Sequence, residues 1–454
     1  MAIVASALIA IEIGAAAVSK PVAALLPVMA LGGILLLVDA RARILFLVFG
    51  GLITLQSSDS FGPLKFLYLV GVLACSGGAL FRFAHSQDWF RRRMTIPLLR
   101  ASIAMLALVC ISLFVSRSHG VVRTDWLRDV APYLLFALAP LFAFDAQSAF
   151  SRRALVRLLV IAGLIAAAAF ATYWVGQRHI ANLPFERFSL ASFLFPAALV
   201  AYAIATALQA RRRRGRWVFL AVLGFALLIV TGTRSTLILA LVPIVVVIAA
   251  RRERAARFGR LALVGPVVLV LMLAAAYGVL TVTHASHTVI GNRLTILKHS
   301  GTSSDASYAD RQAQAHVAGR VFSAHPVFGA GPGTYFNWKM TNGEQRSAFI
   351  IDTPLDFPAK YGVVGLAVVA FLVLSYGSFL TTAFRIKHPR PETLALAAYL
   401  GVALANALLA NPLEDKGWTL GLILLLALVL RTSSGSAPAP VESPLGRTAV
   451  GGAR

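Results

Sequence analysis

Residues 361–384 read YGVVGLAVVAFLVLSYGSFLTTAF and contain no charged side chain. A helix of this length crosses a hydrocarbon core about 30 Å thick, because each residue adds about 1.5 Å along the axis. Apolar runs of similar length recur from one end of the chain to the other. Their residues do not alternate between apolar and polar, as the strands of a transmembrane barrel would. The sequence therefore predicts an all-α, polytopic bundle of transmembrane helices.

The composition agrees with a chain whose main solvent is lipid. Of its 454 residues, 58% are hydrophobic and only 13% are charged, and the mean hydropathy of +0.79 lies well above that of a soluble domain. The formal charge of +24 falls between the apolar runs, so it builds no basic face on a polar domain and gives no support to nucleic-acid binding. Each of the two cysteines lies inside an apolar run, which predicts neither a disulfide framework nor a metal site.

Basic residues in short connections predict the orientation, because arginine and lysine resist translocation. We expect about twelve to fourteen spans, with candidates at 2–18, 21–38, 43–56, 61–82, 96–116, 130–147, 154–176, 189–210, 217–232, 235–250, 261–283, 361–384, 393–410 and 419–431. The arginine-rich connections all follow even-numbered spans; they contain Arg41 and Arg43, Arg91 to Arg93, Arg152 to Arg157, Arg211 to Arg214, Arg251 to Arg254, and Arg385 to Arg390. This pattern predicts a multi-pass protein with both termini in the cytoplasm, and it gives these arginines no further role.

The predicted spans divide the chain into four parts. Residues 1–283 form the N-terminal spans, 284–360 a long extracytoplasmic loop, 361–431 the C-terminal spans, and 432–454 a cytoplasmic tail that is rich in Pro, Gly and Ser and predicted to be disordered. A connection as long as 284–360 is uncommon between packed helices and is usually functional.

Within that loop, residues from Tyr308 to Phe322 predict an amphipathic helix. We expect Ala315, Ala318, Val321 and Phe322 on one face and Arg311, His316 and Arg320 elsewhere. His325-Pro326 ends the helix, and GAGPG at 329–333 predicts a turn.

Arginines on the predicted outer side stand against the orientation rule, and among them we single out Arg187, Arg234 and Arg311. A guanidinium presents a fork of donors that matches paired phosphate oxygens, and an ionisable group at membrane depth is a functional candidate. Alternatively, these side chains reach the lipid headgroups or pair with carboxylates.

The run ADRQAQAHVAGRVFSAHPVFGAGPGTYF at 309–336 resembles the signature of the O-antigen ligase and polymerase superfamily. TGTRSTLILAL at 231–241 and ERFSLASFLFPAALVAY at 186–202 are similar to its two other arginine segments. The resemblance implies a C-type glycosyltransferase fold in a bacterial cytoplasmic membrane. It also implies transfer of a glycan from an undecaprenyl-pyrophosphate carrier to a lipid or glycan acceptor hydroxyl at the outer face, among the membrane lipids.

Under this resemblance, Arg187, Arg234 and Arg311 would bind the pyrophosphate. Arginines held in place stabilise the negative charge that a pyrophosphate leaving group gains as the anomeric bond breaks. The chain lacks a GxxxxGK loop and HExxH or paired-Asp motifs, so we expect no nucleotide, metal or other cofactor. GAGPG alone is only a weak nucleotide signal.

One departure from the family concerns the acceptor side. Family ligases carry a histidine, usually as His-Asn, shortly before a Tyr-Gly-x-x-Gly pattern, but FIIDTPLDFPAKYGVVGL at 349–366 contains none. Asp352 lies nearest that position and is our candidate for a residue that orients or deprotonates the acceptor. Alternatively, Asp352 or Thr353 caps the helix that follows. His316 and His325 are further candidates for an imidazole.

Other charges in the region carry no pattern that ranks them; they are Asp310, Glu344, Asp356 and Lys360, with Asp59, Arg128 and Glu414 elsewhere on the outer side. Ligase and polymerase stay open, because they share the donor chemistry and differ in the acceptor. Two other classes remain. A transporter or flippase of lipid-linked sugars would predict broken central helices and charges at mid-membrane. The missing histidine would suit a non-catalytic component of an exopolysaccharide assembly system.

Overall fold

The computed structural model describes residues 31–54, 63–176, 195–209, 214–230, 242–243, 245–246, 306–340, 343–348, 353–385, 390–408, 411, 413 and 416–433. The predicted spans 2–18 and 261–283 lie outside these residues, as do Arg187, Arg234 and Asp352. Helix α17 (Lys416–Ser433) continues into the predicted tail as far as Ser433.

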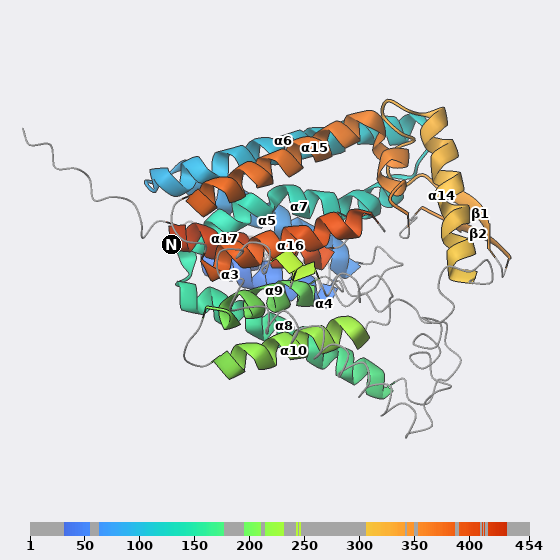
Figure 1. Cartoon of the computed structure of the whole chain (residues 1–454). Helices are drawn as coiled ribbons and strands as arrows, with labels where there is room; N and C mark the ends of the chain where they lie inside the picture. Colours follow the sequence, from blue (N-terminus) through green and yellow to red (C-terminus); the bar gives the residue numbers. More distant parts are fainter. Residues whose placement is uncertain are drawn as a thin grey trace, which may run out of the picture.

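Among the described residues, four helices are long and apolar enough to cross a membrane: α5 (Pro63–Ala84), α6 (Trp89–Ser118), α7 (Arg123–Ala149) and α15 (Asp356–Arg385). Other described helices are α3 (Ala40–Leu45), the π-helical segment η1 (Phe46–Gly50), α4 (Gly51–Thr54), α8 (Arg152–Gly176), α9 (Phe195–Ala207), α10 (Arg214–Val230) and α16 (Pro391–Ala407). The long helices lie side by side along one direction (Figure 1). The prediction of an all-α membrane protein is confirmed, while the number of spans stays a prediction.

Helices α7 and α17 form the centre of the bundle. Every residue from Leu420 to Leu430 is buried, as expected of a helix that is apolar on all sides. In contrast, α6 and α15 bury one face and expose large apolar side chains such as Ile103, Phe114 and Leu374 on the other. These exposed apolar faces are suited to contact with lipid.

Among the predicted cytoplasmic connections, those that the structure describes, around Arg41, Arg91, Arg152 and Arg390, gather at one end of the bundle, which we call the arginine end. There Arg43 is buried and donates two hydrogen bonds to Asp145, from Nε to Oδ2 at 2.7 Å and from Nη2 to Oδ1 at 2.9 Å. A Cβ at Gly78 would lie 2.5 Å from Nη1 of Arg43, so a glycine leaves room for the guanidinium. Arg152 pairs with the buried Glu392 at 2.6 Å. These arginines therefore hold helices together, a role beyond the topological one that we predicted.

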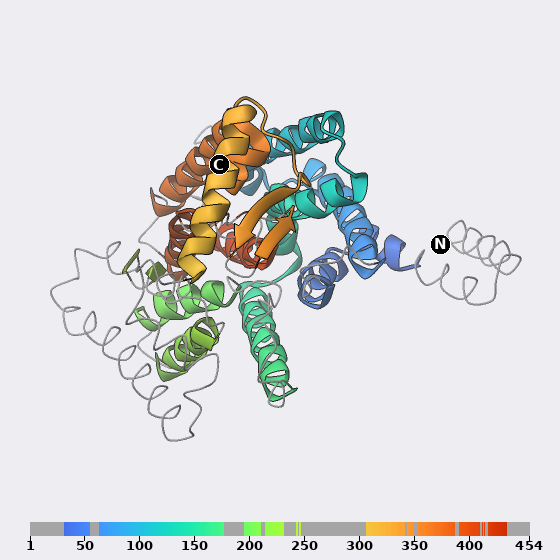
Figure 2. The same cartoon turned by 90° about the vertical axis from the view of Figure 1, so that its right-hand side faces the viewer.

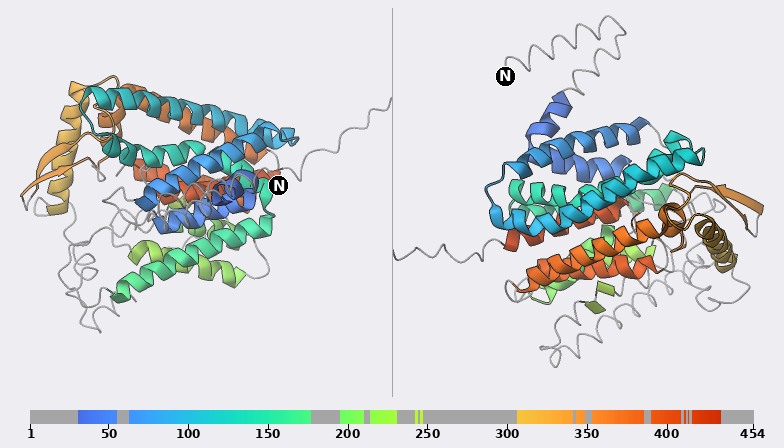
Figure 3. Two further views of the ribbon diagram at one scale, coloured as in Figure 1. Left: turned by 180° about the vertical axis from the view of Figure 1, so that it is seen from behind. Right: turned by 90° about the horizontal axis from the view of Figure 1, so that it is seen from above.

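At the opposite end, helix α14 (Ala306–Ala324) lies across the spans, nearly perpendicular to them (Figures 1 and 2). Strands β1 (Phe336–Met340) and β2 (Gly343–Ser347) follow as an antiparallel pair, with Phe336 opposite Ser347. Seen from behind and from above, α14 and the hairpin stay beyond this end, which we call the α14 end (Figure 3). The predicted helix is confirmed, whereas the hairpin was not predicted.

The buried face of α14 contains Ala318, which packs with Phe336, Trp338 and Ala359. Arg311 precedes Ala318 by seven residues, which is close to two helical turns, and its Nε is buried. The expectation that Arg311 lies away from the apolar face is therefore wrong.

Candidate functional site

Helix α15 is interrupted near its start, at Gly362, whose φ of 62° and ψ of −161° are not helical. The carbonyls of Ala359 and Lys360 accept hydrogen bonds from the N–H groups of Ala330 at 2.9 Å and Gly331 at 3.0 Å. These bonds replace the helical partners that the break removes, as buried backbone groups require.

Across the same break, the N–H groups of Val363 and Val364 donate to the carbonyls of Pro326 at 2.8 Å and Val327 at 3.2 Å. The segment 326–331 is thus joined to α15 by four backbone hydrogen bonds, two on each side of Gly362. Irregular backbone at the edge of a membrane is tolerated where protein pairs it in this way.

Glycine permits the close approach of the GAGPG segment to three helices. Gly329, Gly331 and Gly333 have φ values of 70°, 87° and 79°, a region that other residues avoid. A Cβ at Gly329 would lie 2.3 Å from the carbonyl carbon of Lys360, and one at Gly331 would lie 2.4 Å from Oγ of Ser116. The predicted turn is confirmed, and it also fastens the loop to α6, α7 and α15.

Beneath this turn lies a fully buried ionic cluster, the Lys360 triad, made of Asp129, Asp356 and Lys360. The Nζ of Lys360 donates to Oδ1 of Asp129 at 3.0 Å and lies 3.1 Å from Oδ2 of Asp356. The other oxygen of Asp129 accepts from the N–H of Gly333 at 2.7 Å. The triad therefore ties α7 to the first turn of α15 and to the GAGPG turn.

Polar neighbours extend the triad. Nδ2 of Asn411 donates to the hydroxyl of Tyr133 at 2.7 Å and to Oδ2 of Asp356 at 3.4 Å. Buried charges are stable only when paired and hydrogen-bonded. The arrangement thus favours one fixed geometry at the α14 end of the bundle.

Sequence reasoning gave the triad no role. Asp356 and Lys360 are spaced i, i+4, so they meet on one face of a helix, and this local signal could have identified the pair. Asp129 lies 231 residues from Lys360 in the chain, and no local pattern links them.

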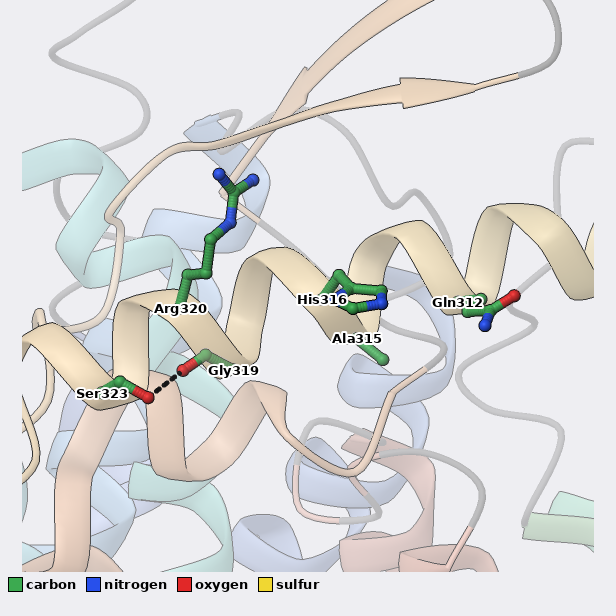
Figure 4. Close-up of a pocket in the computed structure, with 6 residues that line it drawn as sticks. All are labelled: Gln312, Ala315, His316, Gly319, Arg320 and Ser323. Carbon is green, nitrogen blue, oxygen red and sulfur yellow. Dashed lines mark hydrogen bonds between the residues drawn. The ribbon is translucent and has the colours of Figure 1, made fainter.

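Among the predicted site residues, Arg311, His316 and His325 are described and lie on or just after α14. His316 is exposed, with Gln312 and Arg320, on the side of α14 that faces away from Ala318. These three residues line an open pocket of about 560 Å³ with Ala315, Gly319 and Ser323 (Figure 4). Arg311 and His316 therefore project from different sides of the helix.

His325 lies where α14 meets α6. Its ring packs edge-on against the ring of His119, with 4.6 Å between the centroids, and the N–H of Gly329 donates to its carbonyl at 3.0 Å. This position agrees with the predicted end of the helix. Within the described ranges, no group of three or more His, Cys, Asp or Glu side chains could hold a metal ion.

Arg187 and Arg234 lie outside the described residues. The described residues nearest to them in the sequence are the start of α9 and the end of α10. The ring of Tyr202 in α9 packs against that of Trp217 in α10, with 5.5 Å between centroids. Tyr202 also interacts with Arg152 at the arginine end. The first residue of α9, Phe195, and the last of α10, Val230, therefore point toward the α14 end.

Residues 219–370 match the family model described as O-antigen ligase. This stretch contains α14, the hairpin, the GAGPG turn and the break in α15. No curated protein matches the chain. The match confirms the resemblance to the O-antigen ligase and polymerase superfamily over the matched residues, which contain the motifs at 231–241 and 309–336, whereas the segment 186–202 lies outside them.

Proposed function

We propose that the protein is a membrane glycosyltransferase that moves a glycan from an undecaprenyl-pyrophosphate carrier to an acceptor hydroxyl. The reaction would take place at the α14 end, which the arginine pattern predicts to be the outer face. The observation that carries this proposal is the family match at 219–370, because it covers the segment in which α14 and Arg311 are fastened to the bundle.

In this proposal, Arg311 binds the pyrophosphate of the donor together with Arg187 and Arg234. Two features of the fold support this role. Arg311 lies on the side of α14 that faces the bundle, and its Nε is buried. The start of α9, which follows Arg187 in the sequence, and the end of α10, which precedes Arg234, point toward the α14 end. Guanidinium groups held in this way stabilise the charge of the leaving group.

Asp352 is proposed to act on the acceptor hydroxyl as an orienting group or base. The alternative role of a cap can be filled by Thr353 instead. Thr353 is buried, and its Oγ1 accepts a hydrogen bond from the N–H of Leu355 at 3.3 Å. Thr353 thus caps the turn 353–356 that leads into α15, where its carbonyl also accepts from the N–H of Asp356 at 3.3 Å, which supports a different role for Asp352.

Transport of lipid-linked sugars receives less support. A transporter would break its helices near the middle of the membrane, whereas α15 is interrupted only at Gly362 and continues from there to Arg385. The buried Lys360 triad also lies at the α14 end, beside that break.

The test is transfer in vesicles that contain purified protein, an undecaprenyl-linked oligosaccharide and an acceptor, with a chelator and without nucleotide. We expect Arg311→Ala and Arg234→Ala each to lower the rate at least about 100-fold, the usual effect of losing one transition-state donor. Arg153→Ala, which removes an exposed arginine at the other end of the bundle, serves as the matched control.

Wild-type rates for both variants would refute the pyrophosphate role. Failure of the purified wild-type protein to turn over donor would favour a non-catalytic component instead. Product size separates the remaining choices: a ladder of repeats indicates a polymerase, and a single attachment indicates a ligase.

A further inference from the structure

The turn that follows α14 exposes apolar side chains. Pro326 is exposed, and Val327 and Phe328 are 54% and 47% exposed. Turns that face water are usually built from Gly, Pro, Asn, Asp and Ser, so Val327 and Phe328 are the unusual residues here, and the neighbouring exposed face of α14 carries Gln312 and Arg320. An apolar turn next to a polar helix face calls for an apolar partner.

The hydrogen bonds across the break in α15 fix the position of this turn along the axis of the span. The carbonyls of Pro326 and Val327 accept from Val363 and Val364, the first residues of the unbroken part of the span. From Val363 to Arg385 that part is about 34 Å long at 1.5 Å per residue, close to the thickness of a hydrocarbon core of about 30 Å. If Arg385 lies at one boundary of the core, the turn lies at the other.

The apolar surface of the turn continues into the lipid-facing side of α15. Val363 and Leu366 are 54% and 43% exposed, and the backbone bond between Val363 and Pro326 joins the two surfaces. The same side of α15 exposes Leu374 farther along the span. The turn therefore extends a surface that already suits lipid.

Basic residues lie on the elements next to the turn. Arg117 and His119 are exposed at the end of α6, and the ring of His119 contacts that of His325, directly before the turn. Arg320 is exposed on the last turns of α14. Apolar side chains bordered by basic ones form the pattern of segments that insert into the interface of a membrane with anionic lipids.

We propose that residues 326–328 form a membrane wedge, which inserts among the headgroups and upper acyl chains of the leaflet at the α14 end. Arg117 and Arg320 lie at the level of the lipid phosphates. The partner is a bilayer that contains anionic phospholipid. The wedge fixes the depth of α14 at the membrane surface, and it does not depend on the reaction that the protein catalyses.

Nitroxide labelling in proteoliposomes tests the wedge. The label is attached to Phe328→Cys, to Val327→Cys and to the control Gln312→Cys, in a chain with Cys110→Ala, because Cys110 is exposed and Cys75 is buried. In vesicles with anionic lipid, we expect the accessibility to oxygen relative to a water-soluble nickel chelate to be several-fold higher at 327 and 328 than at 312. Equal ratios at the three positions would overturn the proposal.

The two wedge positions guard against a substitution that fails to fold, since either label alone gives the answer. Replacing the anionic lipid with a zwitterionic one tests the cationic border. We expect the ratio at 328 to fall measurably in zwitterionic vesicles, and an unchanged ratio would overturn the part assigned to Arg117 and Arg320.

Discussion

Lys360 is the residue on which the α14 end depends most directly. Its ammonium group lies between two buried carboxylates, and its carbonyl accepts from Gly331. A lysine donates three hydrogen bonds, so one side chain can bind both Asp129 and Asp356. Neither carboxylate is exposed to water, so both rely on partners within the protein.

Replacing Lys360 with methionine should therefore destabilise the fold strongly. Removing one partner of a buried ion pair costs about 3–5 kcal/mol, because the remaining charges stay buried. We expect Lys360→Met to lower the unfolding temperature in detergent by several degrees. Arg153→Met, a change at an exposed arginine, should shift stability by no more than about 0.5 kcal/mol. Equal unfolding temperatures for the two variants would show that the triad does not stabilise the fold.

At the scale of elements, the junction between the GAGPG turn and α15 distinguishes this end of the molecule. It combines a strained backbone with close packing, and the two contributions can be separated. Gly120 has a φ of 73° with nothing near its Cβ position, whereas Gly331 has a φ of 87° with Ser116 only 2.4 Å away.

Alanine at Gly120 should cost only the conformational penalty, about 1–2 kcal/mol. Alanine at Gly331 adds a clash with Ser116 in α6, so we expect it to cost at least about 2 kcal/mol more. Chemical unfolding of the two variants in matched micelles measures the difference. A difference near zero would mean that the loop moves aside without loss of stability.

The sequence predicts elements better than it predicts their junctions. Continuous apolar runs led directly to α5, α6, α7 and α15, because a span needs only length and hydropathy. The hairpin was missed, although the dipeptide Asn342-Gly343 is typical of hairpin connections and lies where the strands meet, with Gly343 opposite Met340. The break at Gly362 was missed because its hydrogen-bond partners lie in another motif, around 326–331.

The candidate site divides in the same way. The type of Arg311 and its place on a helix were predictable from the motif, but its face was assigned wrongly. Asp356 and Lys360 were named from the sequence, but no pattern ranked them above the other charges. Their partner Asp129 is distant in the chain and is brought to them only by the packing of α7.

In the whole molecule, α7 is a central helix with an ionic cluster at each end. Asp129 binds Lys360 at the α14 end, and Asp145 binds Arg43 at the arginine end. The two carboxylates lie about 24 Å apart along the axis at 1.5 Å per residue. The charged groups thus sit near the two surfaces of a membrane, where their burial costs less than at its centre.

This arrangement makes the orientation testable. In a chain with Cys110→Ala, a membrane-impermeant thiol reagent should label Gln312→Cys in intact spheroplasts. It should label Arg153→Cys only after the membrane is permeabilised, because arginine-rich connections stay in the cytoplasm. The reverse result would place the α14 end in the cytoplasm.

The hydrogen bonds across Gly362 also have a consequence for biogenesis. The segment 326–331 leaves the ribosome before α15, so it is already present when that span enters the bilayer. Until the two meet, the N–H groups of Val363 and Val364 can donate to the carbonyls of Ala359 and Lys360, as in an unbroken helix, so the span can enter the bilayer with these four groups paired. Docking of the loop then exchanges two helical hydrogen bonds for the four that join 326–331 to α15, which makes the break at Gly362 a late step of assembly rather than a condition of insertion.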